Sequence, residues 1–160
     1  MSDFARISDG ALKNAELVKG KMASDGVFMV LTRGPSMEPM LSQHRDVVVI
    51  EPVTRELKKY DVPLYVVRGK DDLVLHRIIE VRENDYVIRG DNTYSFEYIP
   101  KEHVIGVLKE FYRKGRYINC TTNKKYHFYV RFTVFTYPLR RFWKCKIKPI
   151  LRKIKRKIIK

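Results

Sequence analysis

Ser36 and His76 are the residues whose types and surroundings could carry nucleophilic chemistry. Ser36 lies in Gly34-Pro35-Ser36-Met37-Glu38-Pro39, directly after the apolar run 27–31. Each proline restricts its own φ and keeps the preceding residue out of helical geometry, so this segment predicts a rigid, non-helical turn that presents Ser36. A serine hydroxyl needs a base within hydrogen-bond reach to become a nucleophile. The same residues are also compatible with an ordinary surface turn.

His76 is the candidate base. It lies in Val74–Ile79, a run that otherwise suits a buried strand, where partial desolvation would favour the neutral imidazole. The alternative is a structural histidine whose nitrogens are satisfied by backbone or a carboxylate. Asp91 follows a glycine at the end of the next predicted strand, from which its carboxylate could orient an imidazole or merely stabilise its own turn. The residues therefore suggest a Ser36–His76–Asp91 set suited to acyl transfer.

Five ordered motifs resemble a known superfamily, that of the type I signal peptidases and the SOS-repressor autoproteases. They cover roughly residues 27–112 and occur in the order and spacing of that superfamily. The motifs are Gly34 to Leu41, Tyr60-Asp61-Val62, Leu75 to Ile79, Val87 to Asn92, and Val104 to Val107. Because His76 stands where the bacterial enzymes and the repressors have a lysine, the sequence is similar to the histidine branch, which contains the endoplasmic-reticulum, archaeal and sporulation-type signal peptidases.

The resemblance implies roles for particular residues. Ser36 would be the nucleophile, with its backbone N–H donating to the oxyanion, and His76 would be the general base. Asp91 would be the acid of the Gly-Asp-Asn motif, and Glu97 stands where the family often has a second acid. Gly34, Pro35 and Met37 would contact the substrate, and Met37 would line a pocket for small residues before the cleavage site.

The sequence departs from the family at two points. Gly34 stands where many signal peptidases have a hydroxyl that completes the oxyanion hole. The transmembrane anchor that normally precedes the nucleophile is not found, and no window of about 18 uncharged apolar residues occurs. The N-terminus does not read as a secretory signal either, so we expect a cytoplasmic protein.

The net charge of +15 belongs to the C-terminal part of the chain. Residues 1–110 contain 16 Lys and Arg against all 18 Asp and Glu, whereas the last 50 residues contain 17 Lys and Arg and no acid. A basic tail predicts an anionic partner, either a membrane surface or nucleic acid. Two cysteines, Cys120 and Cys145, do not make a disulfide framework or a zinc site, and we expect reduced thiols.

Aromatic residues and a helical pattern in this tail favour the membrane. Pro149 suits the first turn of a helix, and the apolar residues that follow recur at helical spacing among lysines and arginines. The predicted membrane-binding residues are Trp143, Ile150, Leu151, Ile154 and Ile158. Nucleic acid is the less favoured partner, because phosphates would leave the apolar side without a contact.

Short apolar runs bounded by turn residues predict a mainly β, barrel-like fold of the signal-peptidase and repressor-autoprotease type. A chain of 160 residues is long enough to bury one hydrophobic core. We expect an N-terminal amphipathic helix within 1–26, a peptidase-like β domain over 27–121, and a basic aromatic tail over 122–160. The predicted strands are 27–33, 46–52, 62–67, 73–81, 86–88, 103–112 and 116–120.

The functional expectation is a serine endopeptidase of signal-peptidase type that cleaves a peptide or preprotein after small residues, with Ser36 as nucleophile and His76 as base. No metal or organic cofactor is implied. The alternative is a catalytically weak or inactive peptide-binding or repressor-like module whose tail binds nucleic acid. Self-cleavage is a third possibility, although no Ala-Gly or Cys-Gly dipeptide precedes Ser36.

Overall fold

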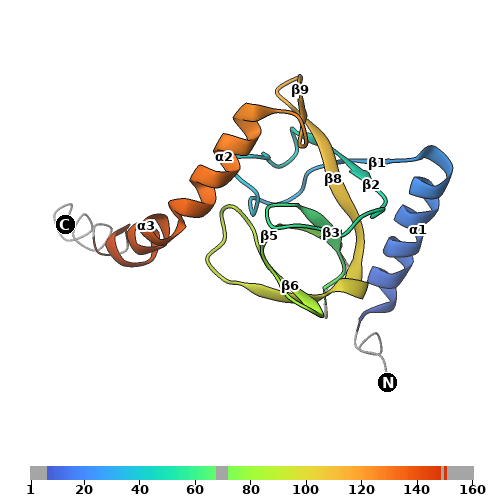
Figure 1. The fold of residues 1–160 in the computed structure, drawn as a ribbon, viewed down its shortest axis with the longest axis horizontal. Coiled ribbons are helices and arrows are strands. Elements are labelled where there is room, and N and C mark those ends of the chain that lie inside the picture. The colour runs from blue at the N-terminus through green and yellow to red at the C-terminus, as the bar shows by residue number, and fades with distance from the viewer. Residues whose placement is uncertain (1–6, 68–71, 149, 151–160) are drawn as a thin grey trace, which may run out of the picture.

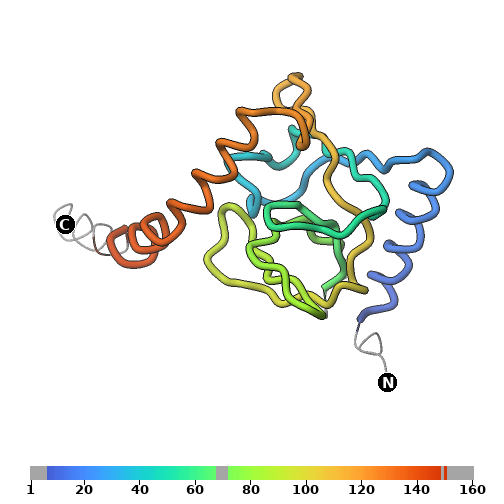
Figure 2. The backbone as a smooth tube through the Cα atoms, viewed as in Figure 1, coloured from blue at the N-terminus to red at the C-terminus, as the bar shows by residue number. Residues whose placement is uncertain are grey.

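Two curled antiparallel sheets form the centre of the molecule, with one helix on one side and a second helical segment on the opposite side (Figure 1). The backbone trace shows the same arrangement without the ribbons (Figure 2). The structure is a computed structural model that describes residues 7–67, 72–148 and 150. The prediction of a β-rich core is confirmed, whereas the prediction of a mainly β protein is only partly right, because three helices accompany the sheets.

The larger sheet has six strands in the order β1-β2-β8-β3-β4, with β9 paired to β8. Its strands are β1 (Phe28–Leu31), β2 (Val47–Glu51), β3 (Pro63–Tyr65), β4 (Val74–Leu75), β8 (Val104–Arg113) and β9 (Arg116–Asn119). The smaller sheet has the order β5-β6-β7, and its strands are β5 (Arg77–Val81), β6 (Asp85–Arg89) and β7 (Glu97–Pro100). All the pairings are antiparallel.

Helix α1 (Asp9–Asp25) corresponds to the amphipathic helix predicted near the N-terminus. The Ser8 hydroxyl caps its first turn by accepting a hydrogen bond from the Ala11 N–H, and Gly26 ends it with a φ of 75°, a conformation that suits glycine. One face of the helix is buried in the main hydrophobic core against strands β1 and β8. That face consists of Ala11, Ala15, Val18 and Met22.

The second helical segment begins after β9. Asn123 caps α2 (Lys124–Phe135) by accepting from the Tyr126 N–H, and α3 (Tyr137–Phe142) and a π-helical turn, η3 (Trp143–Ile147), follow. The sequence predicted only an aromatic lead-in here. The helix predicted from Pro149 onward, with Leu151, Ile154 and Ile158, lies outside the described residues. None of the described helices is long and apolar enough to cross a membrane.

The strand predicted over 73–81 is in fact two strands. Its first part, β4, pairs with β3 in the larger sheet, and its second part, β5, pairs with β6 in the smaller one. His76 is the residue at which the chain passes between the sheets. The sequence did not predict β7, a short strand that ends at Pro100.

Candidate active site

The Ser36 turn follows β1 and is held in place by the loop after β6. The Ser36 carbonyl accepts a hydrogen bond of 2.8 Å from the Asn92 N–H, and the Pro35 carbonyl accepts one of 3.0 Å from Asn92 Nδ2. Gly34 has a φ of 75°, which disfavours any residue with a Cβ. Glycine is therefore the residue that the backbone conformation at position 34 prefers.

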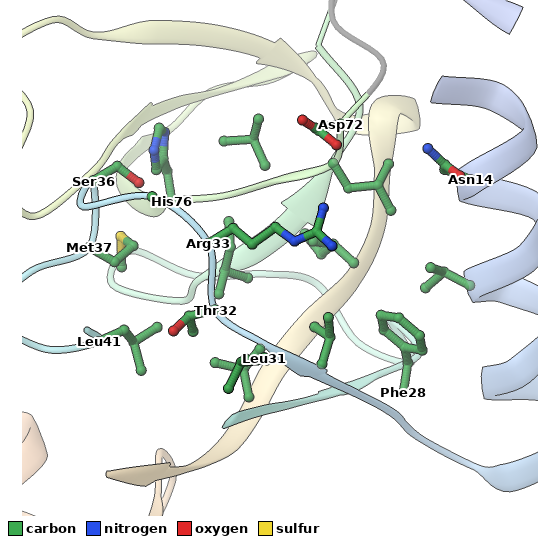
Figure 3. A pocket seen from close by; sticks show the side chains of 18 of the residues that line it. Asn14, Phe28, Leu31, Thr32, Arg33, Ser36, Met37, Leu41, Asp72 and His76 are labelled. Atoms are coloured by element: carbon green, nitrogen blue, oxygen red, sulfur yellow. The ribbon is translucent and has the colours of Figure 1, made fainter. Parts of the chain in front are cut away.

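The structure brings Ser36 and His76 to one cavity. His76 is 5% exposed, Ser36 is partly exposed, and both line the same hollow of about 580 Å³. Figure 3 shows the Ser36 hydroxyl pointing toward the His76 imidazole. A serine nucleophile needs its base within hydrogen-bond reach, and the structure places the two side chains at the same cavity.

Gly90 allows this close approach. A Cβ built at Gly90 would lie 2.6 Å from the Ser36 carbonyl oxygen and 3.1 Å from both Cδ2 and Nε2 of His76. The backbone just after β6 therefore runs directly beside both residues, and the Cδ2–Nε2 edge of the imidazole faces it. A side chain at position 90 would push the two residues out of place.

The other nitrogen of His76 contacts a buried tyrosine. Tyr65, at the end of β3, has its hydroxyl 3.0 Å from His76 Nδ1 and donates a hydrogen bond of 2.5 Å to Glu97 Oε2. Glu97 Oε2 itself lies 3.7 Å from His76 Nδ1. Tyr65 has no exposed surface. Glu97, at the start of β7, thus reaches the imidazole mainly through the phenol.

These contacts determine which imidazole nitrogen is protonated. A phenol has a single hydrogen, and Tyr65 donates it to Glu97, so the contact with His76 requires an Nδ1–H that donates to the phenol oxygen. The Nε2 lone pair is then left on the Ser36 side. Burial, and next the hydrogen bond to Glu97, raise the pKa of Tyr65 far above its ordinary value, so the phenol remains protonated.

The structure places the carboxylate of Asp91, predicted to orient His76, against Arg77. Its two carboxylate oxygens accept hydrogen bonds of 2.8 Å from Nε and Nη2 of Arg77, and both residues are almost completely buried. Arg77 also donates to the Tyr126 hydroxyl of α2, and the Tyr129 hydroxyl donates to Asp91. The buried ion pair therefore joins β5, the loop after β6 and helix α2. Glu97 is the acid associated with the base.

The cavity runs from the Ser36 turn toward α1. Its wall is mainly apolar, and polar groups such as Asn14, Arg33, Asp72 and Thr93 are interspersed along it. Of the predicted substrate contacts, Gly34 and Met37 line the cavity, whereas Pro35 is not among the lining residues. Met37 is 4% exposed. The apolar lining comes from α1, β1, β2, β3, β4 and the residues beside them, including Val18, Val30, Val48, Leu64, Leu73 and Leu75.

Of the residues predicted to bind a membrane, the two that the structure describes do not line the cavity. Trp143 and Ile150 are 56% and 57% exposed on the C-terminal helical segment. In the part of the chain that the structure describes, no group of three or more His, Cys, Asp or Glu side chains could hold a metal ion. Cys120 and Cys145 are free thiols, as predicted.

Sequence reasoning missed Tyr65, which appeared only as one residue of a predicted strand. A polar hydroxyl in the apolar run 62–67 is a weak signal, because a buried tyrosine needs a hydrogen-bond partner but the sequence does not say which.

In the comparisons with known proteins, no protein-family model matched the chain, and no curated protein matched it significantly.

Proposed function

We propose that the protein is a serine endopeptidase of signal-peptidase type. The observation that carries the proposal is the orientation of the Ser36 hydroxyl toward His76, whose opposite nitrogen contacts the Tyr65–Glu97 pair (Figure 3). An unprotonated Nε2 on the side of a serine is what general-base catalysis needs. Membership of the superfamily that residues 27–112 resemble is part of the proposal.

The proposed reaction is acyl transfer to Ser36. His76 Nε2 takes the proton from Ser36 Oγ as this oxygen attacks the scissile carbonyl, and the oxyanion accepts a hydrogen bond from the Ser36 N–H. The imidazolium then gives its proton to the leaving amine, and water attacks the acyl-enzyme in the second step. The Tyr65 oxygen accepts from Nδ1–H throughout, and the Glu97 carboxylate stabilises the transient positive charge through the phenol.

The substrate would bind along the apolar cavity. A largely apolar wall beside Ser36 suits a peptide whose side chains are small or hydrophobic. By the superfamily resemblance, cleavage follows small residues, with Met37 at the base of the pocket for the residue before the cut. We place the enzyme on the cytoplasmic face of a membrane, as a peripheral protein held by its basic C-terminal part.

A peptide-library digestion tests this proposal. Wild type, Ser36→Ala and His76→Ala are incubated with a mixed peptide library, and the products are read by mass spectrometry. We expect cuts after small residues with wild type alone. Cleavage that persists in either variant would refute the assignment of nucleophile or base. Absence of cuts by folded wild-type protein would favour the peptide-binding alternative.

A further inference from the structure

The C-terminal helical segment has two faces of different character. Its inner face carries Tyr126, Val130, Thr133 and Tyr137, which recur at helical spacing and are all buried. The Tyr126 hydroxyl accepts from Arg77, and Tyr137 stacks on Tyr94 and donates to its carbonyl. This face fixes the segment against the sheets.

The opposite face presents a row of large apolar side chains, which we name the outer stripe. Successive members are separated by four, three, four and three residues, a spacing that keeps them on one side of a helix. Every member is more than half exposed, and the Phe128 and Phe132 rings stack with centroids 6.3 Å apart. The outer stripe consists of Phe128, Phe132, Phe135, Leu139 and Phe142, with Trp143 beside its end.

Charge restricts what can cover this stripe. Arg131, Arg141, Lys144 and Lys146 are exposed on the same segment, and the chain has no acidic residue after position 110. A second copy would bring like charges together along the contact. Nucleic acid would neutralise the bases but leave the aromatic rings in water. An anionic bilayer satisfies both features, because rings enter the headgroup boundary while lysine and arginine remain at the phosphates.

We propose that the outer stripe is the surface by which the protein docks on an anionic bilayer. In Figure 1 helix α2 lies beside the sheets and α3 extends beyond them. Because every member of the outer stripe is more than half exposed, the stripe is open to a flat surface. All members of the stripe precede Trp143, the first of the predicted membrane-binding residues, which lies beside the end of the stripe. The helix would lie in the interface rather than span it.

The same segment contacts the loop that holds the Ser36 turn. Lys144 Nζ donates to Asn92 Oδ1 at 2.8 Å, and Arg140 Nη1 donates to the Asp91 carbonyl at 3.1 Å. Asn92 in turn donates to the carbonyls of Ser36 and Pro35. Docking would therefore hold the catalytic loop close to the lipid headgroups. Resting on the proposed function, this assigns the substrate class as peptides or preproteins tethered to the membrane.

Vesicle flotation tests the docking surface without any catalysis. Full-length Ser36→Ala protein is mixed with phosphatidylglycerol–phosphatidylcholine vesicles or with phosphatidylcholine vesicles alone. We expect flotation with the anionic vesicles only, and a blue shift in the fluorescence of Trp143, the single tryptophan of the chain. Phe132→Ser/Phe135→Ser/Leu139→Ser should weaken binding by about a hundredfold, since three apolar side chains are lost from the interface.

The matched control is Met29→Ser/Tyr98→Ser/Tyr117→Ser, which removes from the strands three large apolar side chains that are also more than half exposed. It should bind like the parent protein, and circular dichroism checks that both triple variants fold. Equal binding by the two variants, or no binding by the folded parent, would overturn the proposal. The proposal would also be overturned if the parent protein formed a dimer and bound no vesicles, and the stripe variant were a monomer. Binding of duplex DNA by the parent protein that the stripe variant retains would overturn it as well.

A second measurement tests the link to the site. A peptide cut by the catalytically competent enzyme is prepared with and without an N-terminal palmitoyl chain. With anionic vesicles, we expect the lipidated peptide to be cut at least about tenfold faster, and the stripe variant to lose this advantage while cutting the soluble peptide normally. An unchanged ratio would overturn the substrate assignment. If no peptide is cut at all, the proposed function fails, whereas flotation still decides the docking surface.

Discussion

The phenol of Tyr65 links Glu97 to His76, because its hydroxyl lies 3.0 Å from His76 Nδ1 and donates to Glu97 Oε2, whereas Glu97 Oε2 itself lies 3.7 Å from Nδ1. A direct histidine–carboxylate bond would fix the imidazole tautomer by one hydrogen bond, whereas this arrangement uses two in series. The Tyr65 phenol between them is neutral and buried, so the negative charge stays on the Glu97 carboxylate, which is partly exposed. The effect of Glu97 on catalysis should therefore be smaller than that of a directly bound acid.

We predict that Tyr65→Phe and Glu97→Gln each lower kcat/KM by about tenfold to a hundredfold, because either change weakens the hydrogen bonds that favour the Nδ1–H tautomer of His76. Nitrogen NMR of the His76 ring is the second readout. Wild type should show protonation at Nδ1, and Tyr65→Phe should show a mixture of tautomers. An unchanged tautomer and unchanged kcat/KM in Tyr65→Phe would contradict the positioning role.

Asp91 is expected to affect stability instead. Asp91→Asn leaves the buried Arg77 guanidinium without its counter-charge, which should lower the free energy of unfolding by about 3 kcal/mol. Urea unfolding measures this loss. Glu80→Gln, which breaks the exposed pair with Arg82, is the control and should change stability by less than about 1 kcal/mol. A stable Asp91→Asn protein with no activity would return Asp91 to the catalytic role predicted from the sequence.

At the scale of the elements, the site depends on the passage of the chain from β4 to β5. His76 belongs to neither strand, and Ser36 follows β1. The backbone of Gly90 packs closely against both residues. The chain after β6 can approach Ser36 and His76 this closely because Gly90 has no side chain.

We therefore predict that Gly90→Ala lowers kcat/KM by at least about a hundredfold, because the added methyl would overlap the Ser36 carbonyl and displace the turn. Gly20→Ala is the matched control. Position 20 lies within α1 with nothing within 4 Å of an added Cβ, so that change should leave activity intact and stabilise the protein by about 0.5–1 kcal/mol. Full activity in Gly90→Ala would show that the close contact does not control the site.

Most strands could be predicted from the sequence, because apolar runs such as 46–52 and 103–112 are bounded by turn residues. The split at His76 could not, since only the pairing partners show that the two halves join different sheets. Helix α2 was missed because its aromatic and β-branched residues favour strands. Two signals pointed to it, the Asn123 cap and the helical spacing that begins at Phe128.

The candidate site, like the fold, could be predicted from the sequence only in part. Local turn chemistry and the ordered motifs indicated Ser36 and His76, and the structure places them at one cavity. The identity of the acid depends on which side chains meet across the sheets. Asp91 was expected at the imidazole from its position after Gly90, but the buried Arg77 binds its carboxylate. Tyr65 and Glu97, on β3 and β7, meet only through tertiary structure.

For the whole molecule, buried tyrosines determine the response to alkaline pH. Burial comes first among the causes that raise the pKa values of Tyr65, Tyr126 and Tyr129, to about 12 for Tyr129. In the unfolded chain a tyrosine ionises near about pH 10. Above that pH the unfolded chain releases protons that the folded protein keeps, so folding stability falls as pH rises.

We predict that the free energy of unfolding decreases above about pH 10, by up to about 1.4 kcal/mol per pH unit for each of these tyrosines. Urea unfolding between pH 9 and pH 11.5 measures the slope. Tyr129→Phe removes one group and should make the slope shallower between about pH 10 and pH 12 by up to that amount. Equal slopes in the two proteins would mean that the Tyr129 phenol is not protected by folding.

The inner face of α2 makes the C-terminal segment part of the same hydrophobic core as the larger sheet. Tyr126 hydrogen-bonds the buried Arg77, and Tyr126 and Val130 belong to the main core. A chain shortened at residue 122 to improve its handling would therefore lose core packing together with the basic helix. Loss of activity in such a shortened protein would not distinguish a missing anchor from a damaged active site. Point changes on the exposed side of the helix are needed to tell them apart.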